Sequence, residues 1–77
     1  MLKIGDKIKL YRRSENTNAW LEVRDDKGAA IKGIIKNFSY SRGHYSIFAL
    51  VSFKEDENVY SEELLAINSD KFKLIRY

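Results

Sequence analysis

The chain has 77 residues, of which 44% are hydrophobic and 13% aromatic, and its formal net charge is +3. This length allows one small domain over residues 1–77, and the abundance of aromatic and apolar residues excludes a disordered chain. The absence of cysteine excludes disulfide bonds, thiolate nucleophiles and cysteine-bound zinc. The N-terminus has no signal-peptide core, and no window approaches the roughly 20 apolar residues of a membrane span. We therefore expect a cytoplasmic protein that does not contact membranes.

Charge is distributed unevenly along the chain. Residues 1–44 carry ten basic and five acidic side chains, whereas residues 45–77 carry four basic and six acidic ones. This asymmetry predicts that one side of the fold is basic although the total charge is modest.

The first predicted strand covers residues 7–13. Its apolar residues Ile8 and Leu10 alternate with polar ones, which is the period-two pattern of a half-buried strand. Gly5 and Asp6 favour a turn before it, because glycine tolerates positive φ and aspartate accepts hydrogen bonds from nearby amides. The polar residues 14–18 predict a loop after it. The opposite face of this strand carries a basic stripe with one aromatic ring, formed by Lys7, Lys9, Tyr11 and Arg13.

Residues 17–24 fit either a short helix or a strand. Trp20 and Val23 would share one helical face, but residues 25–28 form a compact turn ending in Gly28, which favours a hairpin. Residues 29–38 then predict a strand whose alternation slips around Gly33. A glycine at such a slip is typical of a bulge or of the bend at the corner of a small barrel.

The longest apolar run, residues 47–53, predicts the central strand. Tyr45 just before it shares one face with four of its residues, which we expect in the core with Ile8 and Leu10: Ile47, Ala49, Val51 and Phe53. Phe48 and Leu50 stand on the opposite face, which something from this chain or another must cover.

The last third of the chain predicts two further strands and a helical turn. Val59 and Tyr60 continue a short returning strand, and Ser61 followed by Glu62 and Glu63 is typical of a helix start. Residues 71–77 alternate again and would close the sheet. The whole pattern predicts an all-β fold, a small antiparallel barrel of five or six short strands with one helical turn before the last strand.

Three segments together resemble the SH3-like small barrel class, including its Tudor-like and KOW-like bacterial and phage members. They are residues 5–10 as an opening strand, residues 31–35 as a bent second strand, and residues 51–53 followed by an acidic turn and residues 60–65. The connection over residues 11–30 looks like the RT loop of these folds. The resemblance implies a binding module, and the small cysteine-free chain would suit a bacterial or phage accessory protein.

Catalysis is not expected, because an acyl-transfer site needs an oriented base and an oxyanion hole. The only histidine, His44, lies in a predicted loop beside serines. The acidic residues 55–57 lack the alternating ligand spacing of a calcium loop. We therefore predict no enzyme activity, no cofactor and no metal.

Two groups of residues are candidates for binding. The basic stripe would attract phosphates and could extend to Lys32 and Lys36 if the second strand pairs beside it, although lysines on an outer face can simply keep a sheet soluble. The second group surrounds Gly43 at a predicted hairpin tip, where it could stack on bases, bind a protein or pack at the barrel rim: Tyr40, Arg42, His44 and Tyr45.

The sequence therefore predicts a non-catalytic binding module, a monomer or weak homodimer, that binds nucleic acid through a basic and aromatic face. The residues expected at that face are Lys7, Lys9, Tyr11, Arg13, Lys32, Lys36, Tyr40, Arg42 and Tyr45. The alternative is a protein-protein interaction module, an adapter or inhibitor. Its interface would comprise Tyr40, Arg42, His44, Tyr45, Phe48 and Leu50.

Overall fold

A computed structural model describes residues 1–43, 46–56, 59–67 and 69–77 of the chain. Its six strands are β1 (Lys7–Arg13), β2 (Trp20–Glu22), β3 (Lys32–Ser41), β4 (Ser46–Asp56), β5 (Val59–Ala66) and β6 (Phe72–Arg76). The predicted all-β architecture is confirmed. No helix in the described part of the chain is long and apolar enough to cross a membrane.

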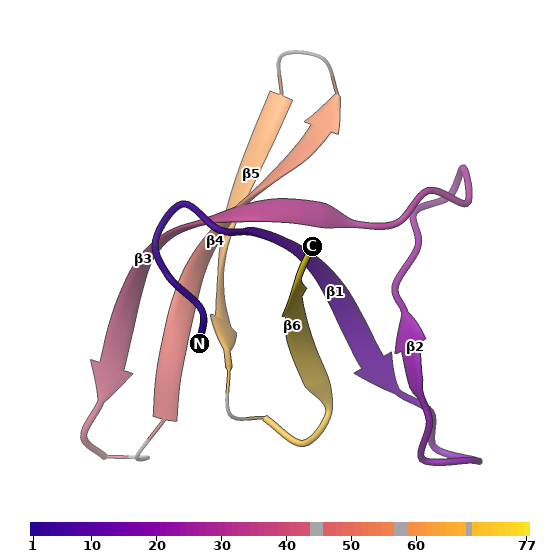
Figure 1. Ribbon diagram of the computed structural model, residues 1–77, viewed down its shortest axis with the longest axis horizontal. Coiled ribbons are helices and arrows are strands. Elements are labelled where there is room, and N and C mark those ends of the chain that lie inside the picture. Colours follow the sequence, from indigo (N-terminus) through magenta and orange to yellow (C-terminus); the bar gives the residue numbers. More distant parts are fainter. Residues whose placement is uncertain (44–45, 57–58, 68) are drawn as a thin grey trace.

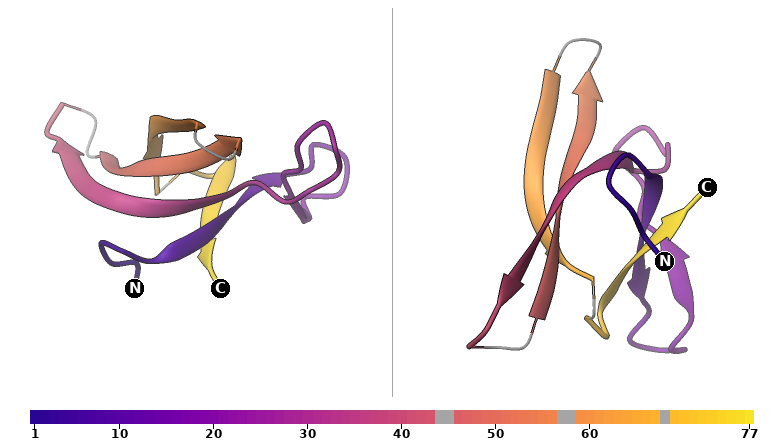
Figure 2. Two further views of the ribbon diagram at one scale, coloured as in Figure 1. Left: turned by 90° about the horizontal axis from the view of Figure 1, so that it is seen from above. Right: turned by 60° about the vertical axis from the view of Figure 1, so that its left-hand side comes forward.

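The strands form one antiparallel sheet in the order β2-β1-β3-β4-β5, and β6 pairs with β1. The first residues of β3 pair with β1, and its whole length from Gly33 onward pairs with β4, so β3 links the two halves of the sheet. Figures 1 and 2 show the resulting curl of β3 and β4 into a half-barrel. Among the described strands, β5 and β6 do not pair, so the half-barrel is open there and the last strand does not close it.

The segment that fitted either helix or strand contains the short strand β2. The turn after it begins with an acidic residue and ends in a glycine of positive φ, as predicted. Trp20 pairs with Arg13 of β1. The Asp25 carboxylate oxygen Oδ1 accepts hydrogen bonds from the backbone amides of Lys27 and Ala29, both at 2.9 Å. Gly28 adopts a φ of 83°, in the left-handed region that glycine tolerates best.

A β-bulge interrupts β3 close to the predicted irregularity. Ile35 pairs with Val51 and Asn37 with Leu50, so Lys36 is the extra residue. A bulge shifts the alternation of side chains by one position. As a result Ile35 before the bulge and Phe38 after it both face the core.

The core lies on the concave side of the sheet. Its buried residues come from four strands and are Ile8, Ile35, Ala49, Val51, Phe53 and Leu74. Leu10 is half-buried and packs against them, as expected. Ile47, however, is 40% exposed, so the prediction that it belongs to the core is wrong. It pairs with Tyr40 near the end of the β3–β4 hairpin, beyond the buried cluster.

The predicted helical turn at residues 61–65 is also wrong. These residues continue β5, in which Ser61, Glu62 and Glu63 pair with Phe53, Ser52 and Val51. The long neighbouring strand β4 offers backbone partners to the whole segment. Local helix preference is a weak bias that such tertiary pairing overrides.

Candidate functional site

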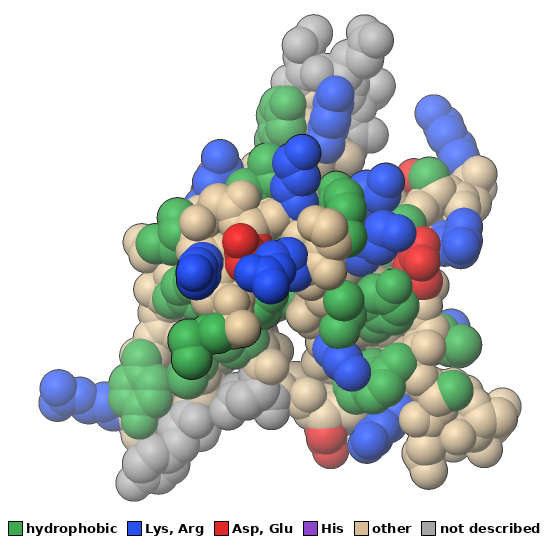
Figure 3. Space-filling model, viewed as in Figure 1, with side chains coloured by type: hydrophobic (Ala, Val, Ile, Leu, Met, Phe, Trp, Pro, Cys, Tyr) green, Lys and Arg blue, Asp and Glu red, His purple; other side chains and the backbone are tan. Residues whose placement is uncertain are grey.

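The basic stripe predicted on β1 lies on the outer face of the sheet, which is the face opposite the core. Lys7 pairs with Ile34 and Lys9 with Lys32, so β3 places Lys32 beside the stripe. Figure 3 shows Lys and Arg side chains over the upper half of the molecule, where β1 and β3 begin. The structure therefore places Lys32 beside Lys9, although the two residues are 23 positions apart in the chain.

A groove of about 660 Å³ lies on this outer face. Its volume is within the range of ligand sites in proteins. We call it the lysine groove; its lining residues are Lys7, Lys32, Gly33, Ile34, Lys36, Ser52, Lys54, Tyr60, Glu62 and Tyr77. The side chains that line the groove include four ammonium groups and one carboxylate. This excess of positive charge makes the groove attractive to anions.

Tyr77 connects the lysine groove to β1. The Lys32 ammonium lies 5.3 Å from the centre of the Tyr77 ring, and the Lys9 ammonium lies 5.5 Å from it. Each contact is within the range of a cation–π interaction, worth about 0.5–1 kcal/mol at an exposed site. The ring therefore contacts two cations contributed by different strands, β1 and β3.

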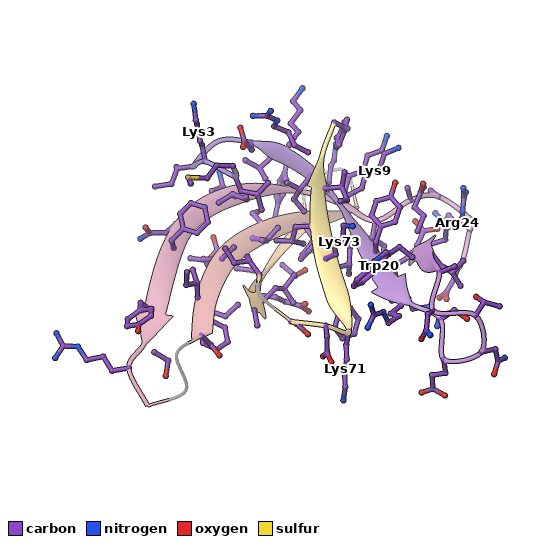
Figure 4. The ribbon with its side chains drawn as sticks, turned by 60° about the horizontal axis from the view of Figure 1, so that its bottom comes forward. Lys3, Lys9, Trp20, Arg24, Lys71 and Lys73 are labelled. Carbon is purple, nitrogen blue, oxygen red and sulfur yellow. The ribbon has the colours of Figure 1, made fainter. Side chains whose placement is uncertain are left out.

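Trp20 has the same arrangement at the other end of β1. The Arg13 guanidinium lies 5.3 Å and the Lys73 ammonium 4.9 Å from the centre of its ring. Figure 4 shows Lys73 and Trp20 close together beside β6 and β1, with Lys9 further along. Tyr11 lies between the two clusters, because it pairs with Lys73 across the β1–β6 ladder.

Cations and aromatic rings are therefore interspersed along the outer face of β1. We call this set the cation–aromatic row, and its members are Tyr77, Lys9, Tyr11, Lys73, Arg13 and Trp20. Glu22, which pairs with Tyr11, adds a carboxylate beside the row, but Arg24 lies 3.6 Å from it and offsets its charge. The row shares Tyr77 with the lysine groove, so the two surfaces are continuous.

The two described members of the predicted hairpin-tip group, Tyr40 and Arg42, do not join these surfaces. Because of the bulge at Lys36, Tyr40 has the same alternation as Phe38 and stands on the core side of the sheet, 57% exposed. Arg42 is exposed in the turn beyond β3. His44 and Tyr45 lie outside the described residues, as do the side chains of residues 55–57.

Phe48 and Leu50 are half-buried on the outer face, as their alternation predicted. Leu50 pairs with Leu64 of β5, and Leu64 is 58% exposed. These side chains form a small apolar area beyond the lysine groove. Tyr40 and Arg42, expected in the same protein interface as Phe48 and Leu50, lie on the other face and in the turn.

Sequence reasoning missed five cationic or aromatic members of the two surfaces: Trp20, Lys54, Tyr60, Lys73 and Tyr77. For Lys54 and Lys73 a signal was present, because strand alternation places them opposite the core residues Phe53 and Leu74. No local pattern indicates that Tyr60 and Tyr77 line the same groove, since β5 and β6 do not pair in the described structure.

Comparisons of the chain with protein-family models, with curated proteins and with solved structures give no significant match. The chain is therefore assigned to no family. Its function is inferred from the geometry of the lysine groove and of the cation–aromatic row.

Proposed function

We propose that this protein is a non-catalytic module that binds nucleic acid, with the phosphate backbone in the lysine groove. The observation that carries the proposal is the convergence of Lys7, Lys32, Lys36 and Lys54 on one groove that also contains two tyrosine rings. Lysines attract phosphates without regard to sequence, and aromatic rings add stacking with bases.

We also propose that the fold belongs to the SH3-like barrel class. The order β6-β1-β3-β4-β5, with the β2 hairpin inserted between β1 and β3, supports this assignment. Such an assignment alone implies no ligand, because one fold can carry unrelated sites. The binding proposal therefore depends on the groove and not on the fold class.

Salt dependence is the property that distinguishes this mode of binding. Each phosphate neutralised by a lysine releases counterions, so log K falls with log salt by about 0.7 per contact on single strands and about 0.9 on duplexes. If the four groove lysines each neutralise one phosphate of a single strand, a rise from about 50 to about 200 mM salt weakens binding roughly 50-fold.

The test is a titration of the wild-type protein into fluorescently labelled oligonucleotides, followed by anisotropy at these two salt concentrations. We expect binding at low salt and a steep loss at high salt. The proposal fails if neither single-stranded nor duplex oligonucleotides bind at low salt, or if an observed affinity does not change with salt.

A second candidate function, binding of a partner protein, is favoured by the exposed Leu64 opposite Leu50 on the outer face. Protein interfaces typically have apolar residues at the centre of the contact area and polar residues around it. An interface of this kind would be nearly insensitive to salt, and substitution of Leu64 by Ser would weaken it. The same substitution would leave oligonucleotide binding unchanged, because Leu64 does not line the lysine groove.

A further inference from the structure

We infer that the ligand is a single strand of DNA or RNA, and that it continues from the lysine groove along the cation–aromatic row to Trp20. This inference rests on the proposed function and adds to it the strandedness of the ligand and a second contact region. No part of it depends on the apolar area around Leu64.

The row presents cations and aromatic rings along one strand, which are the two kinds of group that contact a single nucleic-acid strand. Lys9 and Arg13 are four residues apart on β1, which corresponds to about 13 Å. Tyr77 lies beside Lys9 at one end and Trp20 beside Arg13 at the other, with Tyr11 between them. Successive phosphates can thus meet successive cations while bases meet the rings between them.

The aromatic rings favour a single strand over a duplex. In a duplex both faces of every base are covered by neighbouring base pairs, so only phosphates and groove edges are available to a protein surface. A tyrosine or tryptophan ring can stack on a base only where that base is unpaired. A protein surface that binds only duplex nucleic acid would need the cations of the row, but it would not need the three aromatic rings.

The cations that cover Trp20 are compatible with a base on the same ring. Within the described part of the chain, the side chains of Arg13 and Lys73 make only cation–π contacts, at 5.3 and 4.9 Å from the centre of the Trp20 ring. Such contacts are weaker than the stacking of a base on the same ring. An arriving base can therefore replace one of the two cations on the ring, and the long side chain of that cation can then reach a flanking phosphate.

The test uses the wild-type protein, because Trp20 is its only tryptophan. Oligo(dT) and oligo(U) of about 12 nucleotides, within the usual site size for single strands, and a DNA duplex of the same length are titrated while anisotropy and tryptophan emission are recorded. We expect both single strands to quench the emission of Trp20, and the duplex to bind at least tenfold more weakly without quenching. A preference for one of the two single strands would identify DNA or RNA as the ligand.

Two variants provide the matched comparison. We expect Trp20→Ala to weaken single-strand binding about 5- to 150-fold with an unchanged salt slope, and Trp20→Phe to retain most of the affinity. Phe72→Ala is the control: Phe72 is also an exposed aromatic residue, but it pairs with Arg12 and stands on the opposite face of β6 from Lys73. Circular dichroism verifies that each variant is folded.

The outcomes separate this inference from the proposed function. If the single strands bind with steep salt dependence but Trp20 emission is unchanged, or if the duplex binds equally well, the inference is wrong while the proposed function stands. If Trp20→Ala and Phe72→Ala have the same small effect, the strand does not reach Trp20. If no oligonucleotide binds, both are wrong.

Discussion

Gly33 and Val51 approach so closely across the β3–β4 ladder that a Cβ atom at position 33 would lie 2.6 Å from Cγ1 of Val51. The same Cβ would lie 2.9 Å from the ring of Phe53 and 3.0 Å from the backbone oxygen of Ser52. Only glycine therefore fits at this point, where β3 passes from β1 to β4. The absence of a side chain here lets the core residues Val51 and Phe53 pack directly against the backbone of β3.

We expect Gly33→Ala to destabilise the protein by about 1–3 kcal/mol, because both the core side chains and the backbone of β4 would have to move. Thermal unfolding measures this, since each kcal/mol corresponds to about 4–8 °C in a domain of this size. Gly43→Ala is the control, because no atom of the described residues lies within 4 Å of its Cβ position. Equal melting temperatures for the two variants would contradict the close contact.

The adjacent residues Ile34 and Ile35 should respond very differently to truncation. Ile35 is completely buried in the core, whereas Ile34 is 39% exposed on the outer face. We expect Ile35→Ala to cost about 2–5 kcal/mol and Ile34→Ala about 1 kcal/mol or less. Urea unfolding of both variants measures the difference. A larger loss of stability for Ile34→Ala would mean that Ile34, and not Ile35, points into the core.

The turn after β2 should depend on the carboxylate of Asp25. Removal of the two hydrogen bonds to Lys27 and Ala29 by Asp25→Ala should cost roughly 1–2 kcal/mol. Asp25→Asn, which keeps an acceptor oxygen, should cost less, and Asp26→Ala at the exposed neighbouring position should be close to neutral. Chemical unfolding that ranks Asp26→Ala as the most damaging of the three would contradict this turn.

Tyr60 and Tyr40 are almost equally exposed, at 60% and 57%, but they stand on opposite faces of the sheet. If nucleic acid binds in the lysine groove, Tyr60→Ala should lower the affinity for single strands by about 1–3 kcal/mol. Tyr40→Ala should have no effect, because the bulge at Lys36 turns it away from the groove. Anisotropy titrations compare the two, and a larger loss for Tyr40→Ala would place the ligand on the other face.

Lys54 and Lys27 provide the corresponding comparison for charge. Lys54 lines the groove, whereas Lys27 lies in the exposed turn after β2. We expect Lys54→Gln to weaken oligonucleotide binding and to reduce the salt slope by about 0.7, with Lys27→Gln close to wild type. Identical slopes for both variants and the wild type would exclude Lys54 from the phosphate contacts.

The period-two alternation of the sequence by itself determined much of the fold. It specified β1, the central strand β4 and the burial of Ile8, Val51 and Phe53, because the side chains of any strand point alternately to its two faces. The residues of the β2 turn were equally informative, since the Asp25 carboxylate and the positive φ of Gly28 are local properties of the chain.

Only the tertiary structure decided which distant residues meet. Ser61 with two following glutamates favours a helix locally, but pairing with β4 makes the segment a strand. Because Lys36 is an extra residue in β3, the side chain of Tyr40 points to the core face and not to the outer face that carries the lysines. Lys54, Tyr60 and Tyr77 join Lys7 and Lys32 because of strand register, and register depends on backbone pairing between segments far apart in the chain, which no local pattern encodes.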